Sequence, residues 1–271
     1  MSTRGESILP RRSPLAELRL VVRQVGYEQL SFWLNPIGAI FTVGFALLFL
    51  LMLGASAGSS RVSYLHNIKL VQYYVPGFIA YGVMAASFNS LAISLVIRRE
   101  TGLLKRLRLS PLPTWTLLTS ILLSTLLIAF AEVVLMLAVG RWAFAVQLPS
   151  GPSGIGALLV VLILGGLSFA ALGIAMSTLI PNQQAAGPLT STVFFVLLFL
   201  SGLWFPLKSG SALANISTFF PIRHFITAVF RTFSHPGASA WSGHDLLIVV
   251  IWGVVAAAVA FRRFQWAPRH T

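Results

Sequence analysis

The sequence predicts an all-α polytopic membrane protein. Its composition, its long apolar blocks and the placement of its basic residues all support this fold class. Of the 271 residues, 56% are apolar and 9% are charged, whereas soluble domains have roughly half and a quarter. Several apolar blocks also reach the ~18–20 residues needed to cross about 30 Å of hydrocarbon. The surplus apolar surface therefore has to face lipid.

Six apolar blocks define the predicted spans: residues 36–57, 73–97, 114–139, 155–180, 187–206 and 245–261. No connector has the length of a soluble domain. We therefore expect a single membrane domain, residues 1–271, made of a cytoplasmic segment (1–35), a six-span core (36–261) and a cytoplasmic tail (262–271). The first block is longer than the apolar part of a signal peptide, about 7–15 residues, so we interpret it as a retained span.

The basic residues predict the orientation of the chain. Thirteen of the 19 Lys and Arg residues lie in the N-terminal segment, the connector after the second span and the tail. Because connectors rich in Lys and Arg stay in the cytoplasm, we predict that both termini are cytoplasmic. The net charge of +13 does not indicate nucleic-acid binding, because the basic residues form no single face.

A helix is expected before the first span, beginning at Ser13 and Pro14. Arg19 and Arg23 lie off its apolar stripe, which consists of Leu15, Leu18, Val22 and Val25. This pattern predicts an interfacial helix on the inner leaflet; the alternative is a solvated basic tail. Before the last span, Pro221 and Pro236 interrupt a mostly apolar connector, residues 207–244. We expect short helices there, a broken hairpin in the outer leaflet.

A charged, helix-like insert follows the second span. Its sequence, from residue 98 to residue 111, is Arg-Arg-Glu-Thr-Gly-Leu-Leu-Lys-Arg-Leu-Arg-Leu-Ser-Pro. Leu103, Leu104 and Leu107 can form an apolar ridge that docks in a groove of a soluble partner. Arg99, Lys105, Arg106 and Arg108 would then stay in water. An ordinary positive-inside connector is the alternative.

The pattern Arg-Glu-x-Gly-x-Leu-x-x-Leu-x-x-Ser-Pro in this insert resembles the cytoplasmic loop of type-2 ATP-binding-cassette (ABC) permeases. That family includes daunorubicin-resistance-type drug exporters and exporters of polysaccharides and lipids. A second match is Ser-Gly-Leu-Trp-Phe-Pro-Leu at residues 201–207, followed by Phe220-Pro221 and residues 228–231. The six spans, the interfacial helix and the broken hairpin also fit, so the resemblance covers nearly the whole chain.

The resemblance implies roles for named residues. Arg99, Glu100, Gly102, Leu103, Leu104 and Leu107 would form a coupling helix that touches the ATPase, flanked by Arg98, Lys105, Arg106 and Arg108. Arg19 and Arg23 of the interfacial helix would support the same contact. The hairpin, with Phe205, Pro206, Phe220 and Pro221, would close an outer gate. The family also implies export of an amphipathic substrate through a bacterial plasma membrane, with a second permease, the same or a related chain, and two ATPase copies as partners.

Catalysis is not expected in this chain. A P-loop needs Gly-Lys-Ser/Thr, but the three lysines follow Ile68, Leu104 and Leu207. A partner subunit would therefore bind ATP and Mg²⁺, and we expect no cofactor here. We also predict no metal site, because there is no cysteine and no histidine fits His-Glu-x-x-His.

Polar residues within or next to the spans are candidates for a substrate path: Asn89, Glu132, Gln183 and Gln184. Glu132 lies about 27 Å along its span at ~1.5 Å per residue. That depth, near the outer boundary, favours a hydrated or paired structural role over a proton or substrate site. Small residues at i+4 spacing predict close helix packing: Gly82, Ala86 and Ser90; Gly166 and Ala170; Gly173 and Ser177.

The alternative function is an ion-gradient-driven secondary transporter. Such carriers commonly have intramembrane carboxylates and paired repeats. Apart from Asp245 at the first position of the last span, this chain has one carboxylate within a span, Glu132, and it has no evident repeat between its halves.

Overall fold

The computed structural model describes residues 14–57, 61–62, 68–104, 114–203, 212–234 and 240–263. Within these residues, six helices have the length and apolar composition to cross a membrane, which confirms the six predicted spans. Their bounds are Pro36–Ser56, Leu70–Glu100, Trp115–Phe144, Gly151–Leu179, Gln183–Leu200 and Gly243–Arg263.

The first two spans each contain a short π-helical segment. Span one consists of α2 (Pro36–Ala39), η1 (Ile40–Gly44) and α3 (Phe45–Ala57), and span two of α4 (Leu70–Met84), η3 (Ala85–Ser90) and α5 (Leu91–Glu100). The remaining spans are α7 (Thr114–Phe144), α8 (Gly151–Leu179), α9 (Gln183–Leu200) and α12 (Gly243–Arg263).

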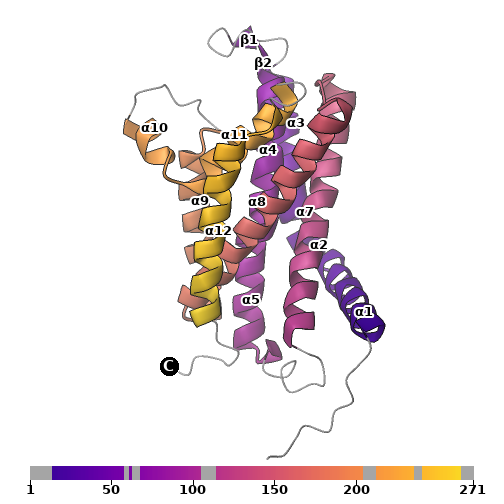
Figure 1. Cartoon of the computed structure of the whole chain (residues 1–271), viewed down its shortest axis with the longest axis vertical. Helices are drawn as coiled ribbons and strands as arrows, with labels where there is room; N and C mark the ends of the chain where they lie inside the picture. Colours follow the sequence, from indigo (N-terminus) through magenta and orange to yellow (C-terminus); the bar gives the residue numbers. More distant parts are fainter. Residues whose placement is uncertain are drawn as a thin grey trace, which may run out of the picture.

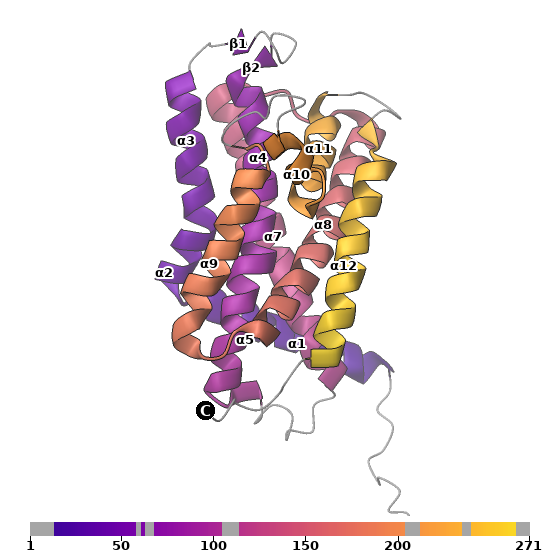
Figure 2. The ribbon, with the colours of Figure 1, turned by 90° about the vertical axis from the view of Figure 1, so that its left-hand side faces the viewer.

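Span two lies in the middle of the bundle. In Figures 1 and 2, α4 and α5 run between α7, α8 and α9. Over its apolar stretch of 18 residues, span two is 78% buried inside the protein, whereas the corresponding stretches of the other spans are 28–50% buried. The other spans therefore expose most of the apolar surface that lipid has to cover.

Glycines allow the central helices to approach closely, as the small-residue spacing predicts. A Cβ added at Gly173 of α8 would lie 2.8 Å from the carbonyl oxygen of Phe88 and 2.9 Å from that of Ser87, both in η3. A Cβ at Gly253 of α12 would lie 2.9 Å from Cα of Ser168 in α8. Gly173 needs to be glycine because backbone oxygens, rather than a mobile side chain, occupy the space, whereas the atom nearest to a Cβ at Gly253 is the Ser168 hydroxyl oxygen, at 2.5 Å.

Helix α1 (Pro14–Trp33) crosses one end of the bundle rather than running along it (Figures 1 and 2). The ends of α5 and α12 lie at the same end, called here the α1 end. Leu15, Leu18 and Val22 are exposed as an apolar stripe, but Val25 is buried with Val21. The predicted apolar stripe is therefore divided: Leu15, Leu18 and Val22 are exposed, whereas Val25 is buried because α1 packs against α7.

The opposite end, called here the hairpin end, carries two short helices before the last span (Figure 1). They are α10 (Ala212–Ser217) and α11 (Pro221–Ser234), and α11 packs against α4, α8 and α12. Helix α11 begins with Pro221, and the fixed φ of proline suits the first position of a helix. The structure thus confirms that short helices occupy this connector. It also adds a two-residue antiparallel pair that was not predicted, β1 (Arg61–Val62) with β2 (Ile68–Lys69).

Candidate functional site

The predicted coupling segment begins as a continuation of α5. The helix runs three residues beyond the predicted end of the span, to Glu100, and then turns at Thr101 and Gly102. Gly102 has φ 72°, a conformation that costs a residue with a Cβ roughly 1–2 kcal/mol. Its N–H donates to the Arg99 carbonyl at 3.1 Å. Gly102 of the family motif therefore ends the helix and redirects the chain.

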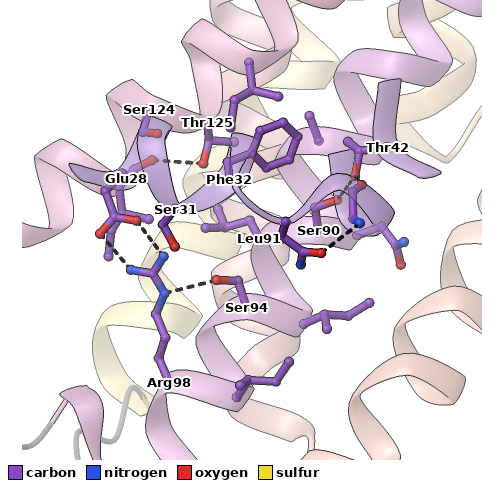
Figure 3. Close-up of a pocket in the computed structure, with 18 of the residues that line it drawn as sticks. Glu28, Ser31, Phe32, Thr42, Ser90, Leu91, Ser94, Arg98, Ser124 and Thr125 are labelled. Atoms are coloured by element: carbon purple, nitrogen blue, oxygen red, sulfur yellow. Dashed lines mark hydrogen bonds and ion pairs between the residues drawn. The ribbon is translucent and has the colours of Figure 1, made fainter. Parts of the chain in front are cut away.

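Arg98 connects this segment to α1. Its Nη1 and Nη2 donate to Oε1 and Oε2 of Glu28 at 2.8 and 2.5 Å, and its Nε donates to Ser94 Oγ at 3.1 Å. Figure 3 shows the carboxylate of Glu28 facing the guanidinium across the gap between the two helices. A bidentate pair of this kind fixes the relative orientation of its two helices.

Arg99 connects the same segment to the other side of the bundle. Its Nη1 donates to the Ser177 carbonyl at 3.1 Å and its Nη2 to that of Ile180 at 2.8 Å. Its Nε pairs with Glu100 at 2.8 Å. Arg99 is 4% exposed, so the expectation that it stays in water was wrong: its guanidinium satisfies carbonyls at the end of α8 that have no helical partner.

The apolar ridge is only partly available to a partner. Leu103 is 41% exposed, but Leu104 is 1% exposed and packs with Leu91, Leu95, Leu117 and Ile121. The expectation that Leu104 lies on the docking surface was therefore wrong, because the turn at Gly102 directs it into the chain's own core. Lys105, Arg106, Leu107 and Arg108 lie outside the described residues.

The two arginines of α1, Arg19 and Arg23, are exposed. Arg23 donates through Nε to the Tyr27 hydroxyl at 3.2 Å, and its guanidinium carbon lies 5.7 Å from the centre of the Tyr27 ring. On the face toward the bundle, Gln29 donates through Nε2 to the Ser124 carbonyl of α7 at 2.8 Å. Helix α1 thus has one face that binds the bundle and another that is free.

A pocket of about 760 Å³ lies between α1, η1, η3, α5 and α7. We call it the α1 pocket (Figure 3). Glu28, Ser94 and Arg98 make one part of its lining polar, whereas Phe32 and Ile128 belong to an apolar part. The lining is therefore amphipathic, as suits a ligand with a polar head and an apolar body.

The two π-helical segments meet at this pocket. Thr42 of η1 and Ser90 of η3 form a hydrogen bond of 3.1 Å between their hydroxyls. Asn89, a predicted path residue, also lines the pocket, and no described residue donates a hydrogen bond to its Oδ1. Short π segments occur often at functional sites. Sequence reasoning missed them because they carry no periodicity signal of their own.

Glu132 lies deeper in the protein than expected. It is 1% exposed, and among the described residues neither carboxyl oxygen has a hydrogen-bond partner. Its carboxyl group packs directly on Gly82 of α4. The expectation of a hydrated or paired Glu132 was therefore wrong, because α7 turns this side chain toward span two.

The predicted path residues do not come together at one described cavity. Asn89 lines the α1 pocket, whereas Glu132, Gln183 and Gln184 do not. Both glutamines are exposed at the start of α9, where Asn182 Oδ1 accepts a hydrogen bond from the Ala185 N–H at 3.0 Å. They lie close in sequence to Ile180, the Arg99 acceptor.

The predicted gate residues divide into two groups. Phe205 and Pro206 lie outside the described residues. Phe220 stacks on Trp252 of α12 with 6.3 Å between ring centres, and the Trp252 indole donates to the Phe219 carbonyl at 3.0 Å. The turn between α10 and α11 is thus connected to the last span.

Comparison with known proteins agrees with this architecture. Residues 59–262 match the family model described as ABC-2 family transporter protein. Probable multidrug ABC transporter permease YbhR of Escherichia coli strain K12 is 29% identical over 202 residues, 73% of this chain and 54% of the relative. Putative transport permease YvfS of Bacillus subtilis strain 168 is 24% identical over 197 residues, 72% of this chain and 78% of the relative.

This chain spans 54% of the length of YbhR. The match to the family model, however, extends over most of the present chain, from just before β1 to the end of α12. It includes five of the six spans, the coupling segment and the hairpin. On this match the chain belongs to the ABC-2 family of transporter proteins.

Proposed function

We propose that this chain is the membrane-spanning permease subunit of an ABC exporter that moves an amphipathic substrate, such as a drug, lipid or glycan, out of the cytoplasm. One observation carries the proposal. The neighbouring residues Arg98 and Arg99 join the end of span two to α1, through Glu28, and to the connection between α8 and α9, through Ile180. A force applied to the segment after α5 therefore reaches both sides of the bundle.

The energy comes from a separate P-loop ATPase, in two copies, that docks at the α1 end. Leu103 is the apolar side chain that the described part of the segment offers to such a partner. This docking makes the α1 end cytoplasmic, in agreement with the distribution of Lys and Arg. A second permease, the same chain or a related one, completes the path across a bacterial plasma membrane.

Directional transport follows if the nucleotide states of the ATPase bind the inward- and outward-facing forms with different affinity. Because Arg98 and Arg99 contact α1 and the α8–α9 connection, we propose that both parts move as rigid bodies when the segment after α5 moves. The hairpin formed by α10 and α11 closes the path at the opposite end.

The α1 pocket supports the amphipathic class of substrate. Its polar part lies at the Glu28–Arg98 pair, and its apolar part lies beside Phe32 and Ile128. The exposed stripe of Leu15, Leu18 and Val22 suits the headgroup boundary of the inner leaflet, from which an amphiphile can reach this pocket.

Co-purification tests the proposal. The tagged chain is isolated from its native membrane in mild detergent, with Leu103→Glu compared with wild type. Leu213→Glu is the matched control, because Leu213 is similarly exposed (46%) but lies in α10 at the hairpin end. We expect a P-loop ATPase with the wild type and with Leu213→Glu, and its loss from Leu103→Glu.

If no ATPase accompanies the wild type, the permease proposal fails and a gradient-driven carrier becomes the leading alternative. If the ATPase binds Leu103→Glu as well as wild type, the docking position fails.

A further inference from the structure

Three side chains that can bind a metal ion converge at the hairpin end, where α11 meets the start of α12. Asp245 Oδ1 lies 2.7 Å from His224 Nδ1 and 4.0 Å from His244 Nδ1. All three ligand atoms lie within 4.8 Å of one another. His224 and Asp245 are buried, whereas the side chain of His244 is 79% exposed. The cluster is thus rigid on one side and open to solvent on the other.

Hydrogen bonds around the cluster determine which atoms are free to bind. The Nε2 atom of His224 lies 2.8 Å from the Thr218 carbonyl oxygen. That oxygen can only accept, so Nε2 carries the proton and, in the neutral ring, Nδ1 presents its lone pair. The Ser242 hydroxyl donates to Asp245 Oδ2, which leaves Oδ1 directed at the histidines.

Two acceptor atoms, Nδ1 of His224 and Oδ1 of Asp245, therefore face each other at 2.7 Å. Such a contact is favourable only with a positive charge between the atoms, either a proton or a metal ion. The exposed imidazole of His244 beside this pair supplies a third ligand, and solvent supplies a fourth.

We propose that His224, His244 and Asp245 bind a divalent transition-metal ion of the zinc class. Imidazole and carboxylate are ligands that zinc prefers, at about 2.0–2.2 Å. The His224–Asp245 pair has to open slightly, and the exposed His244 has to turn inward. The contacts to Thr218 and Ser242 match the outer partners that orient metal-binding histidines and carboxylates. The neighbouring cation, Arg223, instead donates to Ser217 Oγ at 3.0 Å.

Helices α11 and α12 pack on each other. The bound ion would add a further link between α11 and the beginning of α12. It would thereby stabilise the hairpin against the last span. This proposal depends on the geometry of the hairpin end and is independent of the proposed transport function.

Zinc binding by the full-length chain tests the site. The protein carries a tag without histidine, is held in nanodiscs and is titrated with ZnCl₂ against a chromophoric chelator. We expect one tight site per chain and a rise in melting temperature on addition of zinc. His244→Ala removes one of the three proposed protein ligands, so it should weaken zinc binding by at least about tenfold, the loss that removing even an outer partner of a metal ligand typically causes, and should remove the rise in melting temperature.

The remaining histidines provide the matched control. A variant with His66→Ala, His235→Ala and His270→Ala should retain the site. Because His244 is exposed, His244→Ala should elute as wild type in size-exclusion chromatography, and Co²⁺ should give a tetrahedral absorption spectrum with wild type but not with this variant. The proposal is overturned if wild type binds no zinc at micromolar concentration, which leaves a proton between His224 and Asp245. It is also overturned if His244→Ala binds zinc as wild type does.

Discussion

Arg98 and Glu28, which are 70 residues apart in the chain, form a bidentate ion pair with distances of 2.8 and 2.5 Å. The side chains are 19% and 9% exposed, so water screens the pair only in part. Because Glu28 lies in α1 and Arg98 at the end of span two, this pair is the main polar connection between the N-terminal helix and the predicted coupling segment within the described residues.

Removing one partner of this pair tests its contribution to stability. Glu28→Ala leaves Arg98 without its carboxylate, and we expect a loss of about 1–3 kcal/mol, less than the ~3–5 kcal/mol for a fully buried pair. The measurement is thermal unfolding in detergent. The exchange Glu28→Arg with Arg98→Glu should recover part of the loss. Glu17→Ala, in the first turn of the same helix, is the control and should cost no more than ~1 kcal/mol. Equal effects of Glu17→Ala and Glu28→Ala would contradict the pair's role.

A second prediction concerns Arg99, whose guanidinium contacts two carbonyls and Glu100. Arg99→Lys keeps the charge but cannot reach all three acceptors at once. We expect about 1–3 kcal/mol of destabilisation, the cost of a buried polar group left without a partner. Arg19→Lys on the exposed face of α1 should leave the melting temperature unchanged. A fully stable Arg99→Lys protein would mean that the bond network at the end of α8 is dispensable.

The six spans were predictable because crossing a membrane requires only length and apolar composition. Their ends were harder to predict. Span two continues to Glu100 because Arg98 and Arg99 find partners within the protein, Glu28 in α1 and Ile180 after α8, which are remote in sequence. No local pattern contains that information. The turn at Gly102, in contrast, is predictable from the sequence, because a glycine directly after a charged helical segment commonly ends the helix.

The candidate functional residues were only partly predictable, because they too meet through contacts between segments that are remote in sequence. His224 and His244 lie in one connector with no recognisable spacing, and they meet only because α11 folds back on α12. Asn89 and Glu132 were identified by their polarity within apolar spans. Their different surroundings, a pocket for one and a tightly packed helix contact for the other, depend on how the helices rotate toward each other.

Packing between α4 and α7 gives the third prediction. A Cβ at Gly82 would collide with the Glu132 carboxyl, the end of a side chain that has to move aside, so Gly82→Ala should destabilise the protein by about 1 kcal/mol, the low end of overpacking. Glu132→Ala should remove the collision, so the double variant should be more stable than the sum of the two single effects predicts. Gly26→Ala, with open space around it in α1, should instead stabilise by about 1 kcal/mol. Additive effects at Gly82 and Glu132 would rule out the contact.

The fourth prediction separates structure from transport at Glu132. A buried ionisable group without hydrogen bonds costs stability, so Glu132→Gln should unfold at the same temperature as wild type or higher. If Glu132 contacts substrate or a proton during export, Glu132→Gln loses a hydrogen bond to a charged group, worth about 1.5–3 kcal/mol. At a rate-limiting step that loss lowers export roughly tenfold or more. We expect both results together, a stable protein and slow export.

Thr116→Val is the matched control for this experiment, because Thr116 lies in the same helix and its buried hydroxyl also lacks a partner among the described residues. It should leave export unchanged and the unfolding temperature the same or higher, because a buried hydroxyl without a partner costs stability. Export is measured in vesicles that contain the assembled transporter and ATP. Unchanged export by Glu132→Gln would leave Glu132 as a packing residue beside Gly82. Slow export by both variants would point to a general effect of altering α7 rather than to the carboxyl group.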